Sequence, residues 1–219
     1  MVNITFNVER LLKALPHHVT IVAAAKSRTP AEVRQAIQAG ITIIGENFIQ
    51  ETAVAKEVIK DKAHWHFIGH LQSNKVGKAV QLFDMIETLD SAKLAQAVNK
   101  HCLFLNKTMP VLIEVNIGEE SQKYGVAPQE VVSFVEEISP LNGIEVMGLM
   151  TVGPQCDNPN DLIPYYRRTR RLFDEIDTLN LKNVCMKYLS MGMSDSYQQA
   201  IAEGANMVRI GSAIFGPRR

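Results

Sequence analysis

Short apolar runs alternate with amphipathic stretches from one end of the chain to the other. The first run, Val19–Ala25, is β-branched, then small, and carries no charge, which is typical of a strand covered on both faces. Further strand-like runs follow at Thr42–Ile44, His66–Ile68, Met85–Thr88, Val111–Asn116, Ile144–Met150, Val184–Leu189 and Met207–Ile210. The pattern therefore predicts an α/β protein with eight strands.

Helical patterns fill the intervals between these runs. The clearest begins at Thr29, with Pro30 at the first helical position and Glu32 three residues after the cap, and it stops at Gly40. This spacing predicts a capping box. Further helices are predicted from Pro128, across Leu162–Leu179, and from about Ser194–Asp195 to Gly204.

Eight strands with intervening helices in 219 residues fit a (β/α)₈ TIM barrel near the lower size limit of that fold. A doubly wound open sheet is the alternative. No Pro-, Gly- or Ser-rich linker divides the chain, so residues 1–219 are predicted to form one domain. In both architectures, ligands bind where the carboxyl ends of the strands meet.

Lys26 is the first charged residue after the opening strand and stands where that strand should end. Burial there would strip water from its ammonium group and favour the neutral amine. A neutral amine is the form that attacks a carbonyl to make a Schiff base. The alternative is a lysine whose amine reaches past the strand into solvent.

Two loops near the end of the chain are predicted to bind an anion. Met191–Asp195 leads from the seventh strand into a predicted helix start, where unpaired N–H groups face outward. Gly211 and Ser212 follow the last strand, and the glycine lets backbone approach a ligand closely. Phosphate sites after strands seven and eight recur in barrels, whose eighth strand adjoins the first. A carbonyl compound bearing a phosphate would bridge these loops and Lys26.

Composition excludes several classes of function. A formal net charge of zero argues against a general nucleic-acid binder. The cysteines Cys102, Cys156 and Cys185 are widely separated and show neither a disulfide framework nor a metal-ligand spacing. No segment resembles a signal peptide or a membrane span. We therefore expect a cytoplasmic protein without membrane or nucleic-acid partners.

Histidines surround Trp65, but the spacing of His64, His66 and His70 on a short strand is poor for a metal. Structural hydrogen bonding is the favoured interpretation. Glu114 alternates with apolar residues on the fifth strand. If it points into the barrel, its carboxyl group needs a partner.

Several sequence blocks, spread in order along the chain, match a known family. They are Ala25–Ser27, Gly45–Glu51, His66–Lys75, Gly148–Met150, Leu189–Asp195 and Val208–Gly216. On these blocks the chain resembles the YggS/PROSC group of pyridoxal phosphate homeostasis proteins. The resemblance implies a single TIM barrel similar to the N-terminal domain of alanine racemase, carrying pyridoxal 5′-phosphate (PLP).

The resemblance also implies which residues bind the cofactor. Lys26 corresponds to the lysine that forms the Schiff base with PLP. The other implied contacts are Ser194, Gly211 and Ser212 for the phosphate, Arg209 for the pyridine nitrogen and Asn47 for the face of the cofactor. Since arginine keeps its proton, Arg209 would leave that nitrogen unprotonated and weaken the ring as an electron sink. Lys123, in a predicted loop, is a candidate for a second anion or PLP contact.

By this resemblance the protein holds PLP and buffers or delivers it to PLP-dependent client enzymes, without strong turnover of its own. The alternative is a PLP-dependent amino-acid racemase. Racemases of this barrel type use an additional β domain that supplies a catalytic tyrosine and the usual dimer interface, whereas the barrel segments here continue to Gly216. We therefore expect a monomer that is not an enzyme. A Schiff-base aldolase for a phosphorylated sugar is a third interpretation.

Overall fold

Eight parallel strands close into a barrel in sequential order, with the first strand hydrogen-bonded to the last. The computed structural model describes residues 2–59 and 63–217; residues 1, 60–62 and 218–219 of the predicted domain lie outside the described residues. The strands are β1 (Thr20–Ala24), β2 (Ile43–Glu46), β3 (His64–Phe67), β4 (Met85–Leu89), β5 (Met109–Val115), β6 (Ile144–Thr151), β7 (Val184–Ser190) and β8 (Met207–Ile210). The predicted TIM barrel is confirmed, and the open-sheet alternative is wrong.

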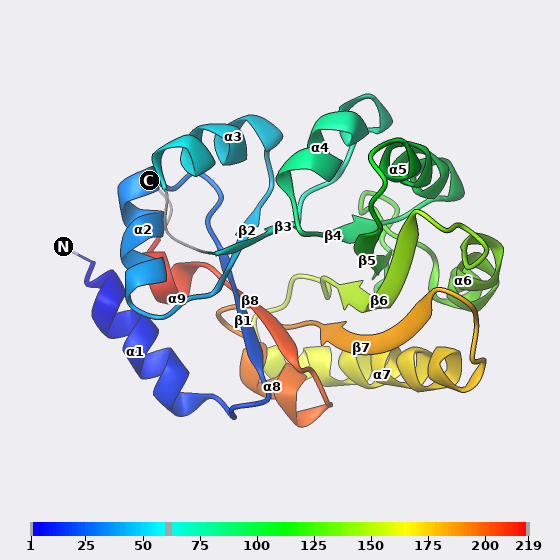
Figure 1. Cartoon of the computed structure of the whole chain (residues 1–219). Coiled ribbons are helices and arrows are strands. Elements are labelled where there is room, and N and C mark those ends of the chain that lie inside the picture. Colours follow the sequence, from blue (N-terminus) through cyan, green and yellow to red (C-terminus); the bar gives the residue numbers. More distant parts are fainter. Residues whose placement is uncertain (1, 60–62, 218–219) are drawn as a thin grey trace.

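Helices surround the barrel on its outer face (Figure 1). They are α1 (Ile4–Ala14), α2 (Pro30–Gln38), α3 (Ile49–Val58), α4 (Val76–Leu82), α5 (Ala92–Phe104), α6 (Val131–Ile138), α7 (Ile163–Thr178), α8 (Tyr197–Ala202) and α9 (Ser212–Phe215). Short 3₁₀ turns, η1 (Ser73–Lys75), η2 (Pro128–Glu130) and η3 (Pro159–Leu162), precede α4, α6 and α7.

The capping box predicted for the first helix after β1 is present. The Thr29 hydroxyl accepts from the Glu32 N–H at 3.3 Å, and the Glu32 carboxylate accepts from the Thr29 N–H at 2.9 Å. These two bonds satisfy backbone donors that the first turn of a helix leaves open. They fix the start of α2 four residues after Lys26.

The predicted start of the helix at Ser194–Asp195 is wrong by three residues. These residues form a turn instead, and α8 begins at Tyr197. The reason is a local hydrogen bond: the Ser196 hydroxyl accepts from the Met193 N–H at 3.2 Å and closes the turn before the helix. Ser and Asp compete with helical bonding in this way.

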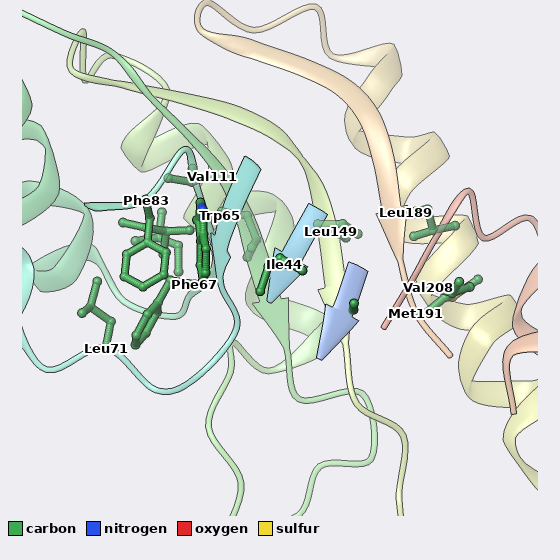
Figure 2. Close-up of a cluster of buried hydrophobic side chains, with 14 of the residues drawn as sticks. Ile44, Trp65, Phe67, Leu71, Phe83, Val111, Leu149, Leu189, Met191 and Val208 are labelled. Atoms are coloured by element: carbon green, nitrogen blue, oxygen red, sulfur yellow. The ribbon is translucent and has the colours of Figure 1, made fainter. Parts of the chain in front are cut away.

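The outer faces of the strands and the inner faces of the helices share one apolar layer. Figure 2 shows aromatic and aliphatic side chains of this layer, including Ile44, Trp65, Phe67 and Leu149. The Phe67 and Phe83 rings meet edge to face, with 5.1 Å between their centroids. Burial of such side chains from water stabilises the ring of helices on the barrel.

A second, smaller apolar cluster fills the barrel itself. Its buried members are Val22, Met85, Leu112, Met150 and Met207. Side chains two residues apart on a strand share a face. Glu87 and Arg209 therefore follow Met85 and Met207 on the inner face, towards the carboxyl ends of the strands. The barrel interior is therefore apolar towards the amino ends of the strands and charged towards their carboxyl ends.

Candidate functional site

One cavity of about 290 Å³ opens at the carboxyl ends of β1 and β8. Its lining includes all six residues that the sequence singled out: Lys26, Asn47, Ser194, Arg209, Gly211 and Ser212. The closed barrel brings the two ends of this set together, because β1 and β8 are hydrogen-bonded neighbours with Val22 opposite Arg209.

Lys26 stands two residues after β1, at the wall between this cavity and a neighbouring one of about 330 Å³. Its ammonium nitrogen lies 5.4 Å from the centroid of the Phe48 ring. The next residue, Ser27, has a φ of 61° and donates its N–H to the Glu51 carboxylate at 3.2 Å. A left-handed φ is unusual for serine, so this bond helps to hold the backbone beside Lys26.

The two predicted anion-binding loops contact each other. The Ser194 hydroxyl oxygen accepts from the Gly211 N–H at 3.2 Å and from the Ala213 N–H at 3.1 Å. Gly192 has a φ of 92°, and a Cβ there would lie 2.6 Å from the Ala200 side chain. Only glycine fits that position. The two bonds to the Ser194 hydroxyl oxygen hold the loop after β7 against the loop after β8.

Arg209 is buried on the inner face of the barrel and still borders the cavity. Its Nη1 donates to the Ser190 carbonyl at 2.9 Å and to the Ser190 hydroxyl at 2.7 Å, and its Nη2 donates to the Thr151 carbonyl at 2.7 Å. Burial lowers the pKa of Arg209, but the charges of Glu87 and Glu114 oppose this shift. The guanidinium remains a cation with N–H donors to spare.

Sequence reasoning missed a buried hydrogen-bond chain behind Arg209. Glu87 Oε1 lies 2.7 Å from His66 Nδ1, and Glu87 Oε2 accepts from the Ser190 hydroxyl at 2.8 Å. Burial acts to raise the pKa of Glu87, but His66, Arg209 and Ser190 together lower it below the ordinary value. The available signal was Glu87, the one charged residue of strand β4.

Glu114 has Arg209 as an electrostatic partner, as its position in the strand required. Burial, and next the charge of Asp90, raise the pKa of Glu114 to about 7, while Arg209 acts in the opposite direction. The carboxyl group therefore changes charge near neutral pH, close to the cation that borders the cavity.

The remaining candidates lie around the cavity or away from it. His66 makes the structural hydrogen bond expected of it, and His70 pairs with Asp90 at 3.4 Å. The described residues contain no cluster of three or more potential metal-ligating side chains. Lys123 pairs with Glu120 at 2.6 Å and lies outside the lining of the Lys26 cavity. A second anion site at Lys123 stays a prediction.

Comparison with known proteins decides the family. The model of the alanine racemase N-terminal domain family matches residues 1–219. A pyridoxal phosphate homeostasis protein of Aquifex aeolicus is 40% identical over 200 residues, covering 91% of this chain and 87% of that protein. A pyridoxal phosphate homeostasis protein of Haemophilus influenzae is 36% identical over 203 residues, covering 91% and 85%. The chain belongs to the pyridoxal phosphate homeostasis protein family.

Solved structures of similar proteins share the barrel. PipY of Synechococcus elongatus without PLP has a TM-score of 0.92 at 30% identity, covering 98% of this chain and 100% of that one. The same protein with PLP bound gives 0.90 at 28% identity, with the same coverage. Alanine racemase of Clostridium difficile matches with a TM-score of 0.83 at 17% identity, over 99% of this chain and 57% of the racemase. The last comparison shows the fold alone.

Within the described ranges, no helix combines the length and apolar character needed to cross a bilayer. The three cysteines are all free.

Proposed function

We propose that this protein binds PLP in the cavity between Lys26 and Arg209 and serves PLP homeostasis by buffering or delivering the cofactor. One observation carries the proposal: a lysine amine, a buried guanidinium and two hydroxyl-bearing loops converge on a single cavity. The names of the relatives and the PLP-bound structure of PipY support the choice of ligand.

The donor set of the cavity fits PLP group by group. Lys26 supplies a primary amine for the aldehyde, Ser194 and Ser212 supply hydroxyl groups for the phosphate, Gly211 lets the backbone approach it closely, and Asn47 supplies a polar contact. Bound PLP supplies an aldehyde carbon that reacts with amines and a ring that withdraws electrons. Each group of the ligand therefore has a partner of complementary chemistry in this chain.

Arg209 is the residue that argues for storage over turnover. A guanidinium keeps its proton and donates hydrogen bonds only, so beside the pyridine nitrogen it gives that atom no proton. An unprotonated ring is a poorer electron sink, and carbanion chemistry is discouraged. This supports a carrier without strong catalytic activity.

We further infer a cytoplasmic, monomeric protein whose single barrel domain spans residues 1–219 and whose partners are PLP-dependent client enzymes. The free cysteines fit a reducing compartment. Delivery fits a cofactor held by an amine, because another amine can displace Lys26.

The experiment that tests the proposal is the visible absorption of purified protein supplied with PLP. We expect wild type to show a band of lysine-bound PLP and Lys26→Ala to lose it. Lys75→Ala is the matched control, because Lys75 borders the neighbouring cavity only and should leave the band intact. After borohydride reduction, mass spectrometry should find the added mass on Lys26. A Lys26→Ala protein that keeps the band would overturn the proposal.

The racemase alternative has its own test. Wild type loaded with PLP is incubated with L-alanine in D₂O, and both the chirality and the α-proton are followed. We expect no exchange beyond that of free PLP. Sustained exchange with multiple turnovers would replace the carrier by an enzyme.

A further inference from the structure

Arg209 begins a chain of buried hydrogen bonds that includes side chains from three other strands. Arg209 on β8 donates to the hydroxyl of Ser190 on β7, and that hydroxyl donates to Glu87 on β4, which meets His66 on β3. Glu87 and Ser190 are 0% exposed, and His66 and Arg209 are 5% exposed. Water therefore takes little part in orienting these groups.

The directions of the Arg209–Ser190 and Ser190–Glu87 hydrogen bonds follow from the chemistry of Arg209. A guanidinium has no acceptor atom, so the Ser190 hydroxyl can only accept from it and must turn its own proton elsewhere. That proton goes to Glu87 Oε2 at 2.8 Å. Because His66, Arg209 and Ser190 lower the pKa of Glu87, its carboxyl group is ionised, and Oε1 accepts from His66 with the histidine proton on Nδ1. All donors point towards Glu87, as an ionised carboxylate requires.

Three of the five N–H groups of Arg209 are used by Ser190 and Thr151. The Nε–H and one N–H of Nη2 have no partner among the described residues, and the side chain borders the Lys26 cavity. A second carboxyl group, Glu114, also acts on Arg209 electrostatically. The hydrogen bonds to Ser190 and Thr151 therefore decide which way the guanidinium faces.

We propose that Glu87 is the positioning residue for Arg209: its buried carboxylate, acting through the Ser190 hydroxyl, fixes the guanidinium with its remaining donors towards the cavity. Glu87 does not border the cavity itself. The inference deepens the proposed function, on which it rests for the identity of the ligand that Arg209 meets.

The first test uses the protein without PLP. Glu87→Gln removes the negative charge but keeps the size of the side chain. We expect the N–H protons of Arg209 Nη1, which bond Ser190, to exchange with solvent at least about tenfold faster than in wild type, the effect of weakening a charge-assisted hydrogen bond. Glu145→Gln is the control, because Glu145 is a carboxyl group of barrel strand β6 that lies at the end opposite the cavity and does not act on Arg209.

The second test uses PLP. Glu87→Gln should raise the Kd for PLP roughly tenfold and shift the pH at which the bound absorption band changes, because a displaced guanidinium no longer faces the ring nitrogen. A role in stability alone would lower the melting temperature and leave the pH profile unchanged. Glu145→Gln should keep the pH profile of wild type.

Ser190→Ala covers the case in which Glu87→Gln does not fold. It removes the bridging hydroxyl and leaves the carboxylate, and it should change the Arg209 signal and the pH profile in the same direction. Wild-type exchange and an unchanged profile in either folded variant would overturn the proposal. If wild type fails to bind PLP, the proposed function fails, while the exchange measurement still decides the role of Glu87.

Discussion

Glu46 is a buried carboxyl group beside the cavity. It is 2% exposed, its Oε2 atom has no hydrogen-bond partner within residues 2–59 and 63–217, and its neighbour Asn47 lines the cavity. Burial, and next the charge of Glu51, raise its pKa from 4.5 to about 8. At neutral pH the folded protein therefore carries Glu46 as a neutral acid.

We predict that Glu46→Gln flattens the pH dependence of stability. Between pH 4.5 and about 8 the native state holds a proton on Glu46 that the unfolded state has lost, so the free energy of unfolding of wild type falls as pH rises through this window. Above about pH 8 Glu46 is ionised in both states, and its destabilisation of the native state no longer changes with pH. Chemical denaturation at pH 5 and pH 8.5 measures this change. Relative to wild type, the free energy of unfolding of the variant should be higher by roughly a few kcal/mol at pH 8.5 than at pH 5. Parallel curves would contradict the neutral acid.

Glu114 predicts a pH effect on ligand binding. With a pKa of about 7, it is neutral at pH 6 and ionised at pH 8, where it places a negative charge near Arg209 and the phosphate-bearing ligand. Glu114→Gln should therefore bind PLP more tightly than wild type at pH 8, by about threefold, and equally at pH 6. Fluorescence titration of PLP at both pH values gives this ratio, and the comparison cancels the titration of the phosphate itself.

Among single residues, those that line the cavity can be predicted from the sequence better than the buried residues that contact them. Lys26 and Gly211 follow strands directly, and the rule that ligands bind at carboxyl ends places them in the site. The contact of Glu87 with Ser190 joins β4 to β7. That contact depends on the tilt and closure of the barrel, which no local pattern encodes.

Among the elements, the boundary between strand and helix after β1 is the best encoded. Pro30, Thr29 and Glu32 define the start of α2 by local chemistry, and the prediction is confirmed. The start of α8 is poorly encoded, because Ser194 and Ser196 have hydroxyl groups that serve either a cap or a turn. Strand β2 also extends beyond its predicted end at Ile44 to Glu46, since neutral Glu46 can be buried where a charged residue could not.

We predict that Thr29→Ala lowers the free energy of unfolding by about 1 kcal/mol, as loss of a helix N-cap does. Thr178→Ala at the exposed end of α7 is the control and should cost less. Urea denaturation at pH 7 measures both. Since α2 begins just after Lys26, a Thr29→Ala variant with unchanged stability would show that barrel packing alone fixes this end of β1.

Across the whole molecule, Arg28 ties the site to the end of the chain. Its guanidinium donates to the carbonyl groups of Phe215 at 3.1 Å, Gly216 at 2.6 Å and Pro217 at 3.2 Å, and it lies 5.6 Å from the Phe215 ring centroid. Arg28 also borders the Lys26 cavity. The hydrogen bonds of Arg28 thus join the segment after β8 to the segment after β1.

We predict that Arg28→Met destabilises the fold by about 2 kcal/mol, because charge-assisted hydrogen bonds are lost while the apolar contact with Phe215 is kept. The exposed Arg10 on α1 gives the control, Arg10→Met, which should be close to neutral. Thermal unfolding followed by circular dichroism compares them. Equal melting temperatures would show that the fastening is dispensable.

The apolar cluster inside the barrel, Val22, Met85, Leu112, Met150 and Met207, limits the routes by which a ligand can reach the cavity. It seals the barrel beneath the charged layer, so nothing the size of a vitamin passes through the middle. PLP therefore has to bind and leave through the same opening, at the rim of the barrel where Lys26 lies. In the proposed delivery role, a client enzyme that takes PLP directly from Lys26 would cover that rim, and the protein could not reload until the client enzyme had left.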